Sequence, residues 1–258
     1  IYVNQIGGQD ELVFDGGSFV IGKDKSLRAQ APSFDETILS TLWKLEDNNL
    51  TCKTSEIFHQ LEGPSSVYKA MTLGLRDYVE KNNFPGVLIG LSGGIDSALS
   101  LAIAVDAIGP EKVHCVLMPS KFTSKESIND ATESSLLLNV QLENIPIEPL
   151  VDAFNTALAG LFKNLKRDAT EENLQARIRA IILMALSNKF GYMVLTTGNK
   201  SEMSVGYATL YGDMCGGYSV LKDLYKTSVF NLAEWRNKNI LDGLLGPDTM
   251  VVPEQVLT

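Results

Sequence analysis

The segment Leu91-Ser-Gly-Gly-Ile-Asp-Ser97 brings together the residue types that bind a phosphate group. Its two adjacent glycines let the backbone approach an anion without a Cβ in the way, and Ser92 and Ser97 add hydroxyl donors. The segment lacks the lysine of the common nucleotide loop, G-x-x-x-x-G-K-[ST]. It holds an acid instead, Asp96. Because a carboxylate beside polyphosphate is repulsive unless a cation lies between them, Asp96 predicts a bound Mg²⁺.

The flanking sequence predicts that this segment joins a strand to a helix. Residues 87–91 are a short continuous apolar run, typical of a strand buried on both faces. In an open parallel sheet, ligands bind beyond the carboxyl ends of the strands, and a helix that begins there offers unpaired amides to an anion. The alternative is a glycine-rich turn in which Asp96 and Ser97 only cap the helix. Six matching positions in a strand–loop–helix context favour the phosphate site.

A second set of polar residues follows later in the chain. Asn173 and Arg177 are four positions apart on one face of a predicted helix, beside an apolar stripe. On spacing alone, an ordinary polar edge beside a core stripe explains this pair better than a binding site does. Thr197 and Glu202 follow the next predicted strand, where a hydroxyl could bind a base or ribose and a carboxylate a metal or a substrate hydroxyl.

Residues 203–222 are rich in glycine and predict a long loop, of the kind that often forms a lid or binding loop. Lys226 follows this loop, just before a predicted helix over residues 227–236. A lysine near the phosphates would offset the charge that develops on a leaving pyrophosphate.

From residue 65 onward, helices alternate with strands. Helices are predicted over residues 65–81, 98–108, 124–138, 151–165, 170–190 and 227–236, and strands over 87–91, 113–118, 141–147 and 192–196. Strands separated by helices imply right-handed βαβ connections. The predicted fold class is therefore α/β, a doubly wound parallel sheet with flanking helices.

The beginning of the chain has a different pattern. Short β-rich runs at 1–5, 11–14, 19–21 and 27–30 predict hairpins. Residues 35–45 have apolar residues at helical spacing, which predicts a short amphipathic helix. The polar, aperiodic stretch after it predicts a linker, which places a domain boundary between residues 46 and 64. A short β-rich piece is thus expected to precede the α/β domain.

Composition limits the classes of protein to consider. The chain has 258 residues, enough to bury a core without disulfides or a structural metal. A net charge of −9 argues against nucleic acid or an anionic membrane as partner. The three scattered cysteines (Cys52, Cys115 and Cys215) fit a reducing cytoplasm better than a disulfide framework or a zinc site. The first residues contain neither Met nor a basic stretch, so we expect the interior of a longer polypeptide without a signal peptide.

The loop resembles the pyrophosphate-loop signature of the ATP pyrophosphatases, enzymes that cleave ATP between its α- and β-phosphates. By itself it does not choose among the amidotransferases and tRNA-modifying enzymes of that superfamily. The wider set of motifs is similar to one family, NAD synthetase in its glutamine-dependent form. The segments that carry the resemblance are 90–97, 118–120, 171–179, 196–202, 206–213 and 222–226.

This resemblance implies an adenine nucleotide alpha hydrolase-like fold for residues 65–258. It identifies residues 1–45 with the tail of a nitrilase-like glutaminase domain and residues 46–64 with a linker. The family's glutaminase cysteine is expected upstream of this chain, and a Pro-Ser-Ala-Glu-Leu segment of its synthetase domain downstream. The synthetase domain is therefore expected to be truncated at its C-terminal end.

The activity implied by the resemblance is the ATP-dependent amidation of deamido-NAD, with Mg²⁺. The nicotinate carboxylate attacks the α-phosphate, pyrophosphate leaves, and ammonia, supplied from glutamine in the full-length enzyme, then displaces AMP. The resemblance also implies a homo-oligomer built on a synthetase dimer.

Carried over residue by residue, the resemblance assigns Asp96 and Lys226 to catalysis and Asp96 with Glu202 to the metal. It assigns Asn173, Arg177 and Glu202 to deamido-NAD. The residues expected to bind ATP are Gly90, Leu91, Ser92, Gly93, Gly94, Ile95, Asp96, Ser97 and Thr197.

Two other functions stay open at this point. One is another ATP pyrophosphatase, such as a relative of GMP or asparagine synthetase or a tRNA-modifying enzyme. The negative charge counts against tRNA, and Asn173 together with the segment 197–202 favours a dinucleotide. The other is an inactive fragment that binds an adenine nucleotide without turnover.

Overall fold

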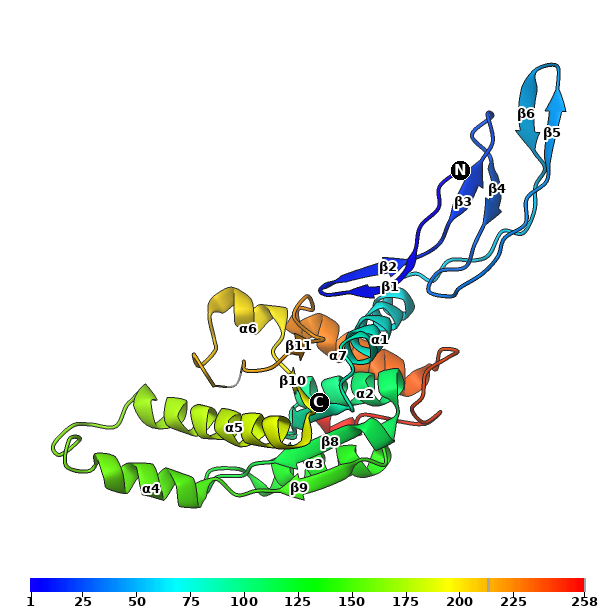
Figure 1. Ribbon diagram of the computed structural model, residues 1–258. Helices are drawn as coiled ribbons and strands as arrows, with labels where there is room; N and C mark the ends of the chain where they lie inside the picture. The colour runs from blue at the N-terminus through cyan, green and yellow to red at the C-terminus, as the bar shows by residue number, and fades with distance from the viewer. Residues whose placement is uncertain (213, 258) are drawn as a thin grey trace. The chain divides into compact units, whose positions relative to one another are not determined.

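The computed structural model describes residues 1–212 and 214–257, apart from the side chain of Glu46. The chain divides into two compact units, residues 1–78 and 79–258. Figure 1 shows the order of the elements along the chain.

The larger unit is built on a five-stranded sheet in which every neighbouring pair is parallel. The strands lie in the order β11-β10-β7-β8-β9. They are β7 (Val87–Gly90), β8 (Val113–Leu117), β9 (Gln141–Asn144), β10 (Met193–Thr196) and β11 (Tyr218–Ser219). The chain runs outward from β7 to β9 and then returns to the other side of β7. The strand order therefore reverses between β7 and β10, which is where open α/β sheets bind their ligands.

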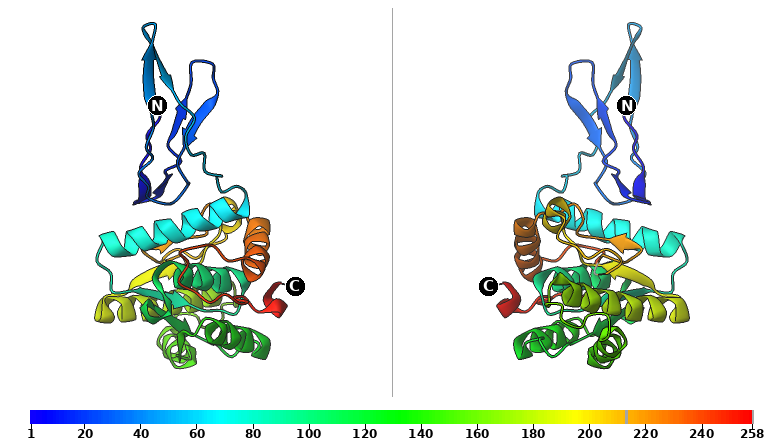
Figure 2. Two further views of the ribbon diagram at one scale, coloured as in Figure 1. Left: turned by 90° about the vertical axis from the view of Figure 1, so that its right-hand side faces the viewer. Right: turned by 90° about the vertical axis from the view of Figure 1, so that its left-hand side faces the viewer.

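Helices cover both faces of this sheet, as Figure 2 shows. Leu88, Val116 and Val194 of three adjacent strands pack in one cluster with residues of two helices, α4 (Glu148–Leu158) and α5 (Ala169–Phe190). Because side chains alternate along a strand, the neighbouring Ile89 points to the opposite face. That face is covered by α2 (Ile95–Ile108), which contacts β7 and β8. The remaining helices of this unit are α3 (Lys125–Leu137), α6 (Lys200–Val205) and α7 (Lys226–Lys238). The predicted fold class is confirmed.

Helix α2 is the most deeply buried helix near the phosphate loop. Every residue in it except Asp96 is buried. A helix that is apolar all round belongs in the interior, and the run Ala-Leu-Ser-Leu-Ala-Ile-Ala-Val leaves no polar face for solvent. The N-terminus of α2, which follows the glycine loop, is therefore held in place by the core.

A buried ion pair ties α2 to α7. Arg236 Nε donates to Asp106 Oδ2 at 2.8 Å and Arg236 Nη2 to Asp106 Oδ1 at 3.0 Å. The two side chains are 1% and 0% exposed. Arg236 Nη2 also donates to the carbonyl of Pro247, so the same guanidinium holds the segment that follows α7.

The smaller unit consists of three antiparallel hairpins and helix α1 (Pro64–Lys81), whose last turn belongs to the larger unit. The hairpins pair β1 (Ile6–Gln9) with β2 (Leu12–Asp15), β3 (Phe19–Ile21) with β4 (Leu27–Gln30), and β5 (Trp43–Glu46) with β6 (Asn49–Cys52). The amide of Gly8 donates to Asp77 Oδ2 at 2.7 Å and so connects the first hairpin to α1.

Two expectations for this unit are wrong. The described structure has no helix over residues 35–45, and the stretch expected to be an aperiodic linker contains strand β6. Asp47 and Asn48 both adopt positive φ, 47° and 62°, which joins β5 to β6 through a two-residue turn. Trp43 packs against the small core cluster of this unit instead of lying on a helical face.

Smaller corrections concern the larger unit. Helix α2 begins at Ile95 rather than at residue 98, so Asp96 and Ser97 lie in its first turn. The region expected to be a long loop includes the second half of α6 and the short strand β11. Helix α4 begins three residues earlier and ends earlier than expected.

Among the described residues, no disulfide joins any of the three cysteines. Cys115 lies in the core, and burial raises the pKa of its thiol to about 12. In the part of the chain that the structure describes, no helix has the length and apolar character needed to cross a lipid bilayer.

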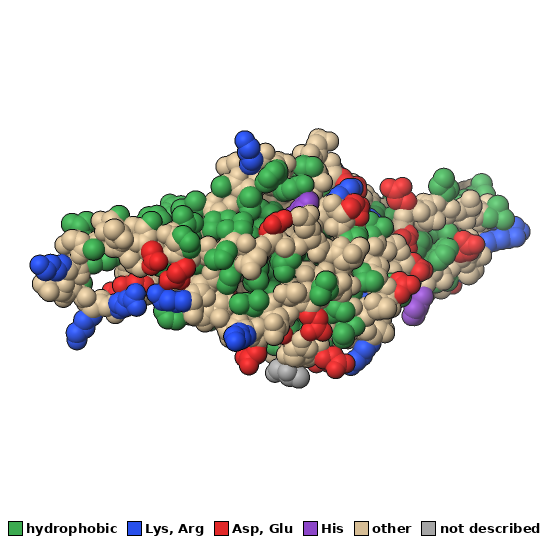
Figure 3. All heavy atoms as spheres, turned by 90° about the horizontal axis from the view of Figure 1, so that it is seen from below, with side chains coloured by type: hydrophobic (Ala, Val, Ile, Leu, Met, Phe, Trp, Pro, Cys, Tyr) green, Lys and Arg blue, Asp and Glu red, His purple; other side chains and the backbone are tan. Residues whose placement is uncertain are grey.

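Large apolar side chains are exposed on α4, on α5 and on the connection between them. Figure 3 shows hydrophobic side chains over this part of the larger unit. The residues are Leu150, Phe154, Leu161, Phe162, Leu165, Ile181 and Met184.

The buried pair makes a prediction about stability. Arg236→Met leaves the Asp106 carboxylate buried without its partner, so we expect the free energy of unfolding to fall by about 3–5 kcal/mol in urea titrations. The free energy of unfolding should fall less in the double variant Asp106→Leu/Arg236→Met than in Arg236→Met. As a control, Lys121→Met breaks an ion pair whose side chains are 50% and 29% exposed, and should lower the free energy of unfolding far less than Arg236→Met does. An equal, small effect of both single variants would contradict the prediction.

Candidate functional site

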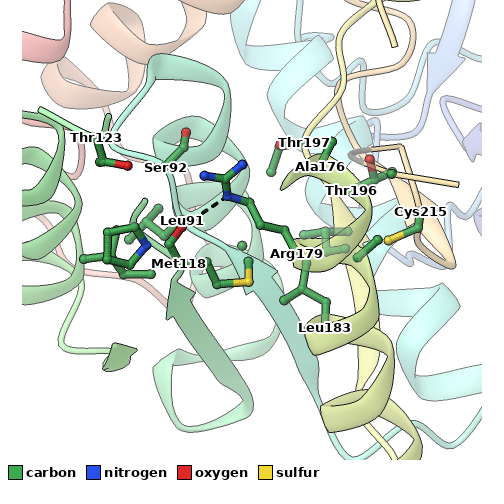
Figure 4. A pocket seen from close by; sticks show the side chains of 16 residues that line it. Leu91, Ser92, Met118, Thr123, Ala176, Arg179, Leu183, Thr196, Thr197 and Cys215 are labelled. Atoms are coloured by element: carbon green, nitrogen blue, oxygen red, sulfur yellow. Dashed lines mark hydrogen bonds between the residues drawn. The ribbon is translucent and has the colours of Figure 1, made fainter. Parts of the chain in front are cut away.

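A cavity of about 340 Å³ lies at the carboxyl ends of β7, β8 and β10, where the strand order reverses. Figure 4 shows it between these strand ends and helix α5. Its described lining residues are Gly90, Leu91, Ser92, Leu117, Met118, Pro119, Thr123, Ala176, Arg179, Ala180, Leu183, Leu195, Thr196, Thr197, Gly212 and Cys215. Four of the residues expected to bind ATP are among them: Gly90, Leu91, Ser92 and Thr197.

The glycine loop continues from the cavity into the first turn of α2. Ser97 Oγ accepts from the amide of Ser92 at 3.2 Å and donates to the carbonyl of Gly94 at 2.9 Å. Ser97 is buried, so its hydroxyl holds the loop in shape and is not directed at solvent. Ser92 and Gly94 are exposed, and the Gly94 amide donates to Ser92 Oγ at 3.3 Å. The loop therefore presents Ser92, Gly94 and the first amides of α2 to a ligand.

Gly93 cannot be replaced by a residue with a side chain, because of both its backbone conformation and its contact with α3. Its φ is 85°, a conformation that side chains other than glycine rarely adopt. A Cβ at this position would also overlap the carbonyl oxygen of Ser127 in the first turn of α3. The neighbouring Gly94 has only the hydroxyl of Ser92 within contact distance of its missing Cβ, so the space beside Gly94 is open.

Asp96 and Lys226, the two residues expected to be catalytic, are brought together. Lys226 Nζ forms an ion pair with Asp96 Oδ2, and Asn199 Nδ2 donates to Asp96 Oδ1 at 2.9 Å. The side chains of Asp96 and Lys226 are 17% and 42% exposed. Lys226 is the first residue of α7, and its amide donates to Ser201 Oγ. Three helices thus begin around one carboxylate.

Asn199 connects this pair to Glu202 and was not among the predicted site residues. It is fully buried and caps α6 through a capping box: its Oδ1 accepts from the amide of Glu202, and Glu202 Oε2 accepts from the amide of Asn199, both at 3.1 Å. The spacing N-x-x-E directly after a strand is a helix-start signal that identifies Asn199 from the sequence. Its bond to Asp96 requires the folded chain.

The predicted magnesium ligands are Asp96 and Glu202, and Asn199 bridges them. Carboxylate oxygens suit Mg²⁺, which is usually bound by one or two carboxylates while phosphate and water supply the other ligands. No cluster of three or more metal-binding side chains occurs within residues 1–212 and 214–257. The donor set therefore fits a metal that arrives with a polyphosphate, and not a metal held by the protein alone.

Asn173 and Arg177 do not line the cavity. Asn173 Oδ1 accepts from Thr209 Oγ1 at 2.8 Å, and Arg177 Nε donates to the carbonyl of Leu210 at 3.1 Å. Both residues therefore hold the loop after α6 against α5. Asp213, which belongs to the motif expected there, lies outside the described residues.

Arg179 is the cavity residue that was missed. It lies on α5 with Ala176, Ala180 and Leu183, at the i, i+3, i+4 and i+7 spacing of one helical face. A single arginine on an otherwise apolar face is the sequence signal that would have identified it. Thr196 also lines the cavity, and its buried hydroxyl has no hydrogen-bond partner among the described residues.

Comparison with known proteins identifies the family. The family model described as NAD synthase matches residues 67–258. This chain belongs to the NAD synthase family. The matched region contains every residue of the cavity and of the Asp96–Lys226 pair.

Individual relatives agree with this family. The chain is 49% identical over 258 residues to a glutamine-dependent NAD(+) synthetase of Acinetobacter baylyi, covering 100% of this chain and 46% of that protein. A solved structure of glutamine-dependent NAD+ synthetase from Acinetobacter baumannii, in complex with ADP, is 50% identical with a TM-score of 0.92, covering 100% of this chain and 47% of that one. An NH3-dependent NAD synthetase from Campylobacter jejuni is 30% identical with a TM-score of 0.63, covering 69% and 75%. The chain thus spans about half the length of the curated relatives it matches.

The contacts of Asp96 lead to a prediction that separates a chemical role from a structural one. Asp96→Asn keeps the shape and one oxygen acceptor but removes the charge. The sequence predicts a site that releases pyrophosphate from ATP, and in Asp96→Asn we expect that rate to fall about 10²–10³-fold. The free energy of unfolding should change by at most about 1 kcal/mol, because the pair is partly exposed. Asp152→Asn, which removes an exposed carboxylate from α4, is the control and should change neither. Asp96→Asn that releases pyrophosphate as fast as the parent chain would remove Asp96 from the mechanism.

Proposed function

We propose that this chain forms NAD from deamido-NAD at the expense of ATP. The observation that carries the proposal is the NAD synthase match over residues 67–258, which includes the phosphate loop, the cavity and the Asp96–Lys226 pair. Relatives that match the whole chain are named glutamine-dependent NAD(+) synthetases. None of the contacts described above favours one of the other functions considered from the sequence.

The proposed reaction has two steps. A carboxylate oxygen of the nicotinate ring attacks the α-phosphorus of ATP, the bond from that phosphorus to the bridging oxygen breaks, and pyrophosphate leaves with the electron pair. Ammonia then attacks the carbonyl carbon of the adenylated intermediate, the bond to AMP breaks, and the nitrogen loses a proton. ATP is a substrate here, and ammonia is derived from glutamine in the full-length enzyme.

The chain's own groups suit the first step. The cavity, with Gly90, Leu91 and Thr197, would hold the nucleoside part of ATP. The loop residues Ser92, Gly93 and Gly94 and the first turn of α2, Ile95 to Ser97, would hold its phosphates. The amides of this turn and Lys226 are preorganised donors at the place where negative charge develops on the leaving pyrophosphate. Asp96 and Glu202 would hold Mg²⁺, which when bound neutralises phosphate charge.

Deamido-NAD would bind beside the cavity, at Asn173, Arg177 and Glu202. Asn173 and Arg177 lie one turn apart on α5, and both bind the loop after α6. Glu202 Oε2 is occupied by the capping box, so Glu202 would use its other oxygen for a ligand.

The partners and location follow the same proposal. We expect a homo-oligomer built on a synthetase dimer, and the exposed apolar side chains of α4 and α5 are a suitable surface for it. Sedimentation of the chain tests this part. The net charge of −9 disfavours nucleic acid and anionic membranes as partners, and three scattered cysteines without a disulfide among the described residues fit the cytoplasm.

The test of the function is NAD formation by the purified chain with ATP, Mg²⁺ and deamido-NAD. We expect activity with ammonium salts, with a rate that rises with pH because NH₃ and not NH₄⁺ is the nucleophile. Glutamine should not replace ammonia, because Cys52 and Cys115 are buried and Cys215 lines the nucleotide cavity. The chain should release pyrophosphate with deamido-NAD but not with aspartate or a GMP precursor. A preference for either of those acceptors would overturn the proposal.

A second prediction concerns the dinucleotide. Asn173→Ala should weaken deamido-NAD binding about two- to tenfold in calorimetric titrations, the effect of one lost hydrogen bond, with little change for ATP. Thr209→Val is the matched control, since it removes the same loop contact but keeps Asn173. If Thr209→Val weakens deamido-NAD equally, Asn173 acts by holding the loop and not by touching the ligand. Equal losses for ATP and deamido-NAD would assign Asn173 to the scaffold.

A further inference from the structure

Arg179 is held in place from one side only. Its Nε donates to the carbonyl of Met118 at 3.1 Å, just beyond the end of β8. Within the described part of the chain, its two terminal amino groups have no hydrogen-bond partner and its guanidinium forms no ion pair. Figure 4 shows the guanidinium pointing into the cavity, toward the part that Ser92 and Thr197 line. The Nε side of the guanidinium is therefore fixed, and its two terminal amino groups are available to a ligand.

The charge of Arg179 is uncompensated. Among the described residues that line the cavity, Arg179 is the only charged one, and the others are apolar, glycine, or carry a hydroxyl or thiol. Burial alone lowers the pKa of the guanidinium, with no contribution from a neighbouring charge. Arginine nevertheless stays protonated in proteins. A partly desolvated cation without a counter-ion among the described residues is unfavourable, so the cavity is electrostatically complementary to an anion.

The position of Arg179 identifies which anionic group this is. The cavity includes the start of the glycine loop, up to Ser92, but its lining does not include residues 93–97. The first turn of α2 and Lys226 lie beyond that boundary and suit the terminal phosphates. A nucleoside in the cavity would therefore have its first phosphate at the boundary. A guanidinium recognises phosphate oxygens through paired N–H donors, which the free edge of Arg179 provides.

We propose that Arg179 binds the α-phosphoryl group of the nucleotide, and that it is the residue by which the cavity prefers a nucleotide to a nucleoside. The inference rests on the proposed use of ATP. In this arrangement, α5 supplies the positive charge beside the reacting α-phosphorus. Helices α2 and α7 supply the positive groups beside the departing phosphates.

The test is a thermodynamic cycle with adenosine, AMP and ADP, titrated into the 258-residue chain and into Arg179→Met. Methionine keeps an unbranched apolar side chain of similar length without the charge. We expect the preference for AMP over adenosine to fall about ten- to a hundredfold in Arg179→Met, the effect of losing charged hydrogen bonds. Adenosine affinity should stay the same, which also shows that the variant is folded. The additional preference for ADP over AMP should be retained, because the second phosphate binds elsewhere.

Two further variants sharpen the result. Arg167→Met removes a guanidinium just before α5 that forms an ion pair with Glu171, is 69% exposed and does not line the cavity. It should keep the parent preference for AMP. Arg179→Lys keeps the charge but loses the fork, and should recover part of the preference.

The outcomes distinguish this inference from the proposed function. If Arg179→Met loses equal affinity for adenosine and for AMP, or keeps the parent preference for AMP, the role of Arg179 is overturned while the nucleotide site remains. Failure of the parent chain to bind AMP and ADP would overturn both.

Discussion

Two ion pairs between α2 and α7 hold the part of the molecule on which the site depends. Asp106 pairs with Arg236 near the ends of the two helices, and Asp96 pairs with Lys226 at their beginnings. The pairs are separated by the same number of residues on both helices, roughly 15 Å along each axis, so the helices run side by side in the same direction. The Asp106–Arg236 pair is completely buried, so the two helices have little freedom to slide past each other. Such a pair adds little net stability compared with apolar side chains of the same size, but each of its charges requires the other.

This arrangement explains how a carboxylate and a lysine that are far apart in the chain meet at the phosphate loop. Asp96 lies in the first turn of α2, Lys226 is the first residue of α7, and Asn199 is the N-cap of α6. The beginnings of helices carry unpaired amides and the positive end of the helix dipole. Their convergence makes this edge of the sheet suitable for the phosphates of a nucleotide. Asp96 is the negative group that balances the positive charge gathered there.

The cavity differs from this edge in its electrostatics. It is mostly apolar, and Arg179 is the only charged residue among its described lining. An apolar cavity suits a base and ribose, while a charged loop beside it suits phosphates. The boundary between the two environments lies at Ser92, next to the place where a nucleoside would join its first phosphate. Helix α5 contributes to two features of the site: one of its faces lines the cavity, and Asn173 and Arg177 hold the loop after α6.

The sequence by itself determined the strand–loop–helix around Ser92 to Ser97, because a short apolar run, two glycines and a helix are local signals. It also placed Asn173 and Arg177 on one helical face and predicted the parallel sheet from the alternation of elements. It misassigned residues 35–45, of which only 43–45 belong to a strand, β5. Apolar spacing alone does not distinguish a helix from irregular backbone that leads into a hairpin, here with its turn at Asp47 and Asn48.

Only the tertiary structure decided which of these residues meet. The contacts of Asp96 with Lys226 and Asn199 join segments about a hundred or more residues apart, and they depend on the strand order and on the packing of α2 against α7. The place of Arg179 in the cavity depends on the position of α5 over β7 and β10. Periodicity and turn signals report the preferences of neighbouring residues. They contain no information about which helix crosses which strand, because that choice is made by burial of the whole core.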